Sequence, residues 1–132
     1  MTGPQILVVE DNEKNMKLFR DVLLATGHRT LEATTGGQAV ELATAHAPDL
    51  VLMDIQLPDI GGVEALGRLR ADARTAAVPV VALTAQAMEG DRERFLAAGF
   101  DGYLSKPVNV ADLLATVKRY CGGATTVPAS PK

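Results

Sequence analysis

Several features are scarce in this sequence, and each scarcity excludes a class of protein. Cys121 is the only cysteine, so no disulfide can form within the chain, which fits a reducing cytosol. No apolar run approaches the roughly 20 residues that cross a bilayer, and the first residues lack the basic and apolar stretches of a secretory signal. The net charge of −3 leaves no basic excess for non-specific nucleic-acid binding. We therefore expect a cytoplasmic protein that binds neither membranes nor nucleic acid directly.

The composition is that of one globular domain. The chain has 132 residues, of which 47% are hydrophobic and 22% charged, so it can bury a full core and differs from a disordered protein. From Gly122 onward the sequence turns to Gly, Thr, Pro, Ser and Lys, which is typical of a frayed end. We expect a domain over residues 1–121 and a flexible tail over residues 122–132. Cys121 is expected to be a half-buried, inert residue at the end of the last helix.

Short apolar runs alternate with stretches of helical periodicity along the chain. Apolar runs bounded by chain-breaking residues predict strands at 5–9, 50–54 and 79–84. A weaker strand is predicted at 28–34, where polar and apolar residues alternate, and a fifth at 101–105. Helical spacing of apolar residues predicts helices at 13–26, 36–46, 63–73, 86–98 and 109–121. Asn12 and Asn109 are expected to cap helix starts, and Gly27 and Gly99 to end helices. Val63 and Val110 are predicted to face the core. Because crossovers between parallel strands are right-handed, this alternation predicts a three-layer α/β fold.

The strand predicted at 50–54 carries the most informative side chain. Its apolar run, Leu50 to Met53, ends on the carboxylate of Asp54, and Pro58 stops any continuation four residues later. A carboxylate at the end of a buried strand is costly unless another group pairs with it. In open parallel sheets, binding and chemistry collect outside the carboxyl ends of the strands. Asp54 is therefore the first candidate for a functional residue.

Three other predicted strands also end on reactive side chains, which are Glu10-Asp11, Thr84 and Lys106. The strand order 2-1-3-4-5, taken from flavodoxin and a chemotaxis receiver, would bring these ends together at one edge. Three carboxylates in one cleft repel one another, and Mg²⁺ relieves that repulsion while accepting phosphate oxygens. Asp54 would then be a nucleophile toward phosphorus, with Lys106 and Thr84 neutralising or binding the phosphoryl oxygens.

With these residues in place, the chain resembles response-regulator receiver domains from about Gln5 to Cys121, a family with a flavodoxin-like (βα)5 fold. It is most similar to stand-alone receivers of the DivK cell-cycle type. The matching motifs are Val9-Glu10-Asp11-Asn12, Asn15-Met16-Lys17-Leu18-Phe19, Met53-Asp54-Ile55-Gln56-Leu57-Pro58, Leu83-Thr84-Ala85 and Gly102-Tyr103-Leu104-Ser105-Lys106-Pro107. Each motif alone is weak, but all of them in order at strand ends are specific.

The resemblance implies a two-component response regulator with a phosphoacceptor at Asp54. A histidine kinase or histidine phosphotransferase would supply the phosphoryl group, and the protein would accept it without acting as a turnover enzyme. Mg²⁺ would be bound by Asp11, Asp54 and the carbonyl of Gln56, with Glu10 acting largely through a bound water. The Lys106-Pro107 peptide would be cis. Glu10-Asp11 departs from the frequent Asp-Asp pair, and the longer Glu is a common variant.

The resemblance also implies a route from the phosphoryl group to a partner. Thr84 would move to bond the phosphoryl oxygens, and Tyr103 would then turn inward. The surface over residues 87–98 and 101–120 would carry a downstream protein target. Gln56 and Gln86 would flank the phosphoryl group and set the lifetime of the phosphorylated state.

Other interpretations of the same residues remain open. Glu10, Asp11 and Asn12 also suit a simple helix cap, and Tyr103 also suits a half-buried aromatic. A phosphatase of the haloacid dehalogenase type uses similar groups, but it has Asp-x-Asp where this chain has Gln56, and it carries a cap domain. A flavodoxin-like electron carrier would need a phosphate-binding loop after the first strand. This chain has Asp11 at that place, and its charge would repel the phosphate of FMN. The chain also suits a piece cut from a longer kinase or regulator.

Overall fold

Strands and helices alternate through the whole of the described chain. The computed structural model describes residues 3–85 and 90–121. The strands are β1 (Gln5–Val9), β2 (Arg29–Ala33), β3 (Leu50–Asp54), β4 (Val80–Thr84) and β5 (Gly102–Ser105). The helices are α1 (Glu13–Ala25), α2 (Gly36–His46), α3 (Gly61–Ala71), α4 (Asp91–Ala98) and α5 (Val110–Cys121). The predicted start of the fourth helix at residue 86 or 87 lies outside the described residues.

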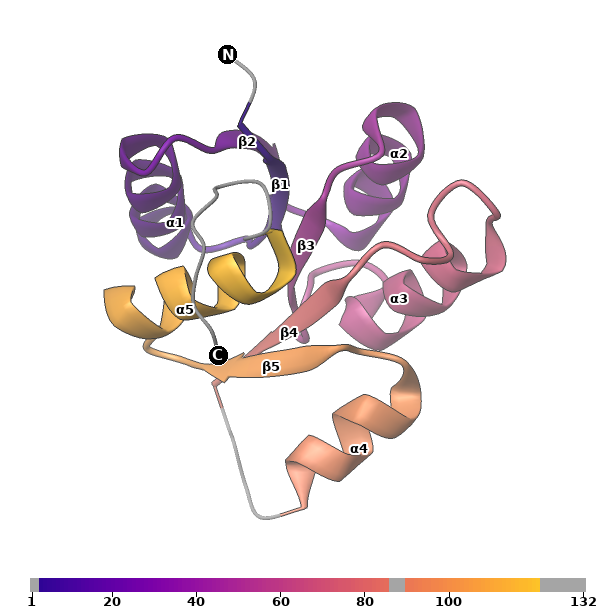
Figure 1. Ribbon diagram of the computed structural model, residues 1–132. Helices are drawn as coiled ribbons and strands as arrows, with labels where there is room; N and C mark the ends of the chain where they lie inside the picture. Colours follow the sequence, from indigo (N-terminus) through magenta and orange to yellow (C-terminus); the bar gives the residue numbers. More distant parts are fainter. Residues whose placement is uncertain (1–2, 86–89, 122–132) are drawn as a thin grey trace.

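The five strands form one sheet in the order β2-β1-β3-β4-β5, with every neighbouring pair parallel. Figure 1 shows α1 and α5 on one face of this sheet and α2 and α3 on the other. This confirms the predicted three-layer fold and strand order. Within the described residues, no helix is both long enough and apolar enough to cross a bilayer.

Alternate residues of the central strands supply two separate cores. Ile6, Leu52 and Leu83 belong to the core beneath α1 and α5, which buries Phe19 and Leu113. The other core lies beneath α2, α3 and α4 and is built from residues such as Leu7, Met53, Ala82, Leu66 and Phe95. Because β3 and β4 are buried along their entire length, polar side chains are confined to the strand ends. That confinement concentrates the chemistry of the chain at one edge of the sheet.

Most predicted helix ends are confirmed by cap geometry. The Asn12 side chain accepts a hydrogen bond from the Asn15 N–H at 3.1 Å, and Asn109 accepts one from the Asp112 N–H at 2.7 Å. Two predictions about buried faces are wrong, because Val63 is 51% exposed and Val110 is 44% exposed. Val63 lies beside the buried face of α3, which begins at Gly62, and Val110 lies one turn before Leu113, the first buried residue of α5. Gly90, expected inside a helix, instead precedes α4.

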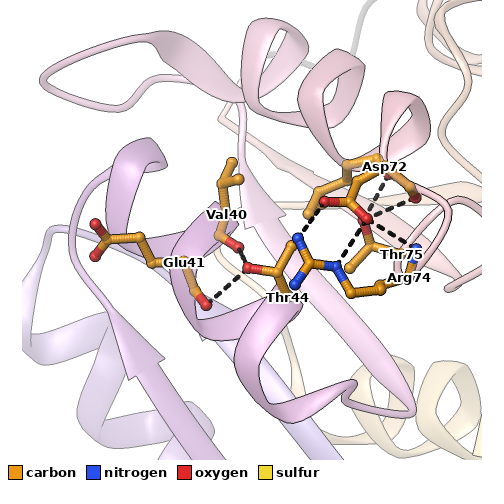
Figure 2. Close-up of polar contacts among 7 residues, drawn as sticks. Val40, Glu41, Thr44, Asp72, Arg74 and Thr75 are labelled. Atoms are coloured by element: carbon orange, nitrogen blue, oxygen red, sulfur yellow. Dashed lines mark hydrogen bonds and ion pairs between the residues drawn. The ribbon is translucent and has the colours of Figure 1, made fainter.

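The turn that leads from α3 into β4 is closed by its own polar contacts (Figure 2). The buried Thr75 hydroxyl donates to the Leu69 carbonyl at 2.6 Å. The Arg74 guanidinium lies 2.8 Å from the Asp72 carboxylate, and hydrogen bonds from Arg74 lower the pKa of Asp72 to about 2. Figure 2 also shows Thr44 of α2, whose hydroxyl donates to the Val40 carbonyl at 2.9 Å. These contacts hold the ends of two helices that cover the same face of the sheet.

Candidate functional site

The carboxyl ends of β1, β3, β4 and β5 open into one cleft of about 580 Å³. The residues predicted from the sequence that line it are Glu10, Asp11, Asp54, Gln56, Thr84 and Lys106. They meet because parallel register aligns the strand tips: Asp54 pairs with Leu83, and Thr84 with Ser105. The structure therefore brings together residues separated by almost 100 positions in the sequence.

Three carboxylates form the acidic side of the cleft. Oxygen atoms of Glu10, Asp11 and Asp54 lie within 4.8 Å of one another. Glu10 and Asp54 are buried, with 1% and 5% exposed, whereas Asp11 is exposed. Burial is the main cause of a raised pKa at Glu10, and it outweighs the opposing hydrogen bonds from Lys106 and from the Asn12 N–H. Such crowding of oxygen ligands fits a hard divalent cation such as Mg²⁺.

Lys106 faces two of these carboxylates. Its Nζ lies 2.7 Å from Oδ2 of Asp54 and 2.8 Å from Oε1 of Glu10. Burial is the largest single influence on the pKa of Lys106 and lowers it, but hydrogen bonds to Asp54 and Glu10 together raise the pKa above its ordinary value. The ammonium therefore stays charged beside Asp54. The Lys106-Pro107 peptide is cis, as the resemblance implies.

The backbone around Asp54 is fixed from two sides. Its Oδ1 accepts a hydrogen bond from the Gln56 N–H at 2.9 Å, while the Ile55 N–H donates to the Leu83 carbonyl at 3.0 Å. Gly62, in the first turn of α3, donates from its N–H to the Ile55 carbonyl at 2.9 Å. A Cβ at Gly62 would lie 2.5 Å from the Asp54 carbonyl oxygen, so only glycine permits this approach. Asp54 is thus presented from a rigid strand end.

Comparison with known proteins decides the family. Residues 6–118 match the response regulator receiver domain. The chain is a response regulator receiver. It is 47% identical over 119 residues to the polar-differentiation response regulator DivK of Brucella ovis, covering 90% of this chain and 97% of that protein. It therefore belongs to the receiver domains of two-component signalling.

Two solved receivers bear directly on the cleft. The receiver domain of sensor histidine kinase PA1611 from Pseudomonas aeruginosa holds a magnesium ion in its active-site cleft. It is 40% identical, with a TM-score of 0.84, over 92% of this chain and 99% of that one. The Saccharomyces cerevisiae receiver of Ssk1, crystallised with the histidine phosphotransfer protein Ypd1, is 28% identical, with a TM-score of 0.83, over 96% of each chain.

The residues predicted to switch the receiver lie beside the cleft. Thr84 ends β4 and is 6% exposed. Tyr103 on β5 is half-buried, and its ring centroid lies 5.9 Å from that of Phe95 on α4. Gln86, predicted to flank the phosphoryl group, lies outside the described residues. The remaining predicted site residues are all in the cleft or next to it.

Two residues of α4, Arg94 and Phe95, also line the cleft. The sequence placed this stretch only on the expected target surface over residues 87–98. The Arg94 guanidinium lies 2.8 Å from the Asp91 carboxylate and 5.3 Å from the Phe95 ring centroid. Phe95 also contacts Tyr103, so it joins the cleft to the surface of α4 and β5. The one signal for Phe95 was its position as an aromatic residue in a short, highly charged helix.

Proposed function

We propose that Asp54 of this receiver accepts a phosphoryl group from the phosphohistidine of a histidine kinase or histidine phosphotransferase. An Asp54 carboxylate oxygen attacks phosphorus, the P–N bond breaks as the O–P bond forms, and the departing imidazole takes a proton from solvent. The observation that supports this best is the contact of Asp54 with Lys106 in a cleft that also holds Glu10 and Asp11. The solved complex of the Ssk1 receiver with a phosphotransfer protein supports the class of donor.

Different residues of the cleft would stabilise the phosphoryl group and bind the metal ion during the transfer. Lys106 places its ammonium beside Asp54, where it offsets charge on a phosphoryl oxygen, and the Thr84 hydroxyl donates to another. Asp11, Asp54 and the carbonyl of Gln56 would hold Mg²⁺, with Glu10 acting through a bound water. Bound Mg²⁺ would supply charge neutralisation for the phosphoryl oxygens. The magnesium ion in the cleft of the PA1611 receiver supports this assignment.

The proposal makes this protein a stoichiometric acceptor rather than a turnover enzyme. The receiver spans residues 1–121 and works in the cytoplasm, where the buried Cys121 stays a free thiol. The test is the intact mass after incubation with acetyl phosphate and Mg²⁺. Wild-type protein should gain one phosphoryl group per chain, and neither Asp54→Asn nor a chelated wild-type sample should gain any. Sustained hydrolysis of a phosphomonoester would instead favour a phosphatase.

We further propose that the surface of α4, β5 and α5 carries the downstream protein target. Phe95 lines the same cleft as Thr84 and contacts Tyr103. A movement of Thr84 can therefore be transmitted to this surface through the packing of Phe95 against Tyr103. A hollow of about 190 Å³ lies on it, between Leu96, Tyr103 and Tyr120. Coupling of this kind is typically about 1–3 kcal/mol. Crystal structures with and without beryllofluoride should differ at Thr84 and Tyr103, and identical positions would contradict this route.

A further inference from the structure

The loop between β3 and α3 is tied to a helix that takes no part in the cleft. The Asp59 carboxylate accepts hydrogen bonds from the N–H groups of Gly36 at 2.7 Å and Gly37 at 2.9 Å, one on each oxygen. These are the first two residues of α2, 23 and 22 positions earlier in the chain. An anion at a helix N-terminus is favoured by the helix dipole and by N–H groups that have no partner within the helix.

The loop between β3 and α3 also packs closely against the N-terminus of α2. A Cβ at Gly36 would lie 2.5 Å from Cγ1 of Ile60, so the glycine lets the loop approach the helix end. Hydrogen bonds from Gly37 and then Gly36 lower the pKa of Asp59. The carboxylate is therefore charged at neutral pH, and the contact persists under the conditions in which a receiver works.

This contact fixes one end of a short segment whose other end is the phosphoacceptor. Asp54 is held by β4 and by Gly62, and Asp59 is held by α2. Residues 55–58 lie between these two anchors, and the Gln56 N–H donates a hydrogen bond directly to Asp54. We propose that Asp59 is a positioning residue for the cleft, holding this loop so that the Gln56 carbonyl and Asp54 keep the geometry needed to bind the cation. The inference rests on the proposed function.

A purely structural role would be to cap α2, and the chain contains a control for that role. The Thr35 side chain is the N-cap of the same helix and accepts a hydrogen bond from the Gln38 N–H at 3.1 Å. Thr35→Ala removes a cap from α2 without touching the loop, whereas Asp59→Ala removes a cap and also releases the loop. The two variants should therefore lose stability alike and differ only at the cleft.

The experiment compares wild-type protein, Asp59→Ala, Asp59→Asn and Thr35→Ala. Isothermal titration calorimetry gives the Mg²⁺ dissociation constant, and thermal unfolding without metal gives the midpoint temperature. We expect similar drops in midpoint for Asp59→Ala and Thr35→Ala. Asp59→Ala, unlike Thr35→Ala, should bind Mg²⁺ about tenfold more weakly, as outer-shell substitutions at metal sites do. Asp59→Asn, which keeps one acceptor oxygen, should fall between wild type and Asp59→Ala.

Phosphorylation by acetyl phosphate supplies a second readout. The initial rate for Asp59→Ala should fall at limiting Mg²⁺ and recover at saturating Mg²⁺, while Thr35→Ala follows wild type at both. Wild-type Mg²⁺ affinity in Asp59→Ala would overturn the inference, as would an equal loss of affinity in Thr35→Ala. A wild-type protein that is not labelled at Asp54 would instead overturn the proposed function, so the two failures are distinct.

Discussion

The Lys106 ammonium lies 2.8 Å from Oε1 of Glu10, a carboxylate with 1% of its surface exposed. Removing the lysine would leave that buried acid without its counter-charge. We predict that Lys106→Met lowers the free energy of unfolding by about 1–3 kcal/mol in the absence of metal. Urea denaturation measures this. Lys17→Met is the matched control, since Lys17 pairs with Asp21 on the exposed surface and its loss should cost less than about 1 kcal/mol. Equal losses would contradict the prediction.

The acidic cluster predicts that Mg²⁺ stabilises the fold through Asp11. Because Asp11 is exposed, Asp11→Asn should change metal-free stability by less than about 0.5 kcal/mol. Mg²⁺ at 100 times its dissociation constant should stabilise wild-type protein by about 2.7 kcal/mol. Thermal unfolding across a Mg²⁺ series should show this shift in wild type and in Asp21→Asn, an exposed acid on α1, and not in Asp11→Asn. A full shift in Asp11→Asn would rule out this ligand.

Two glycines of α3 should respond oppositely to the same change. Gly62→Ala would push a Cβ to 2.5 Å from the Asp54 carbonyl oxygen, so we predict a loss of about 1–3 kcal/mol and slower phosphorylation. Gly67 has open space around its Cβ position, so Gly67→Ala should stabilise the helix by about 0.5–1 kcal/mol. Urea denaturation and labelling by acetyl phosphate measure both. A neutral Gly62→Ala would show that the backbone at Asp54 is not held as described.

Cys121 predicts a pH dependence at the alkaline end. Burial, and then the charge of Asp49, raise the pKa of this thiol from 9.0 to about 11. Between these pH values the unfolded chain loses the thiol proton while the folded chain keeps it, so stability is complete below pH 9 and falls as pH rises toward 11. The loss should reach about 2 kcal/mol. The free energy of unfolding should therefore fall more steeply for wild type than for Cys121→Ala, and parallel profiles would contradict this.

The fold and most of the cleft could be predicted because strand ends are conspicuous in this sequence. Apolar runs that stop at Asp54 and Thr84, and a short strand that stops just before Lys106, identify both the strands and the residues at their tips. The strand order could not be read in the same way. Since β3 and β4 are buried along their whole length and apolar up to their last residue, they contain no alternation to mark an edge or a face, and the order was taken from other doubly wound folds.

The rest depended on contacts that no local pattern encodes. Asp59 and Gly36 are 23 positions apart and meet only once α2 and α3 pack side by side. Val63 fits a helical period, yet it lies in the first turn of α3, where its side chain is exposed. The buried face of α3 runs through Gly62, Ala65, Leu66 and Leu69. A hydrophobic period alone does not separate a position on that face from one beside it.

We expect the carboxylate of Asp54 to carry the phosphoryl group. Reduction with borohydride converts an aspartyl phosphate to homoserine, and peptide mapping by mass spectrometry then locates it. After reaction with acetyl phosphate and Mg²⁺, we predict homoserine at position 54 and at no other acid. Homoserine at position 11 in place of 54, or none in a protein that has gained a phosphoryl group, would contradict the account.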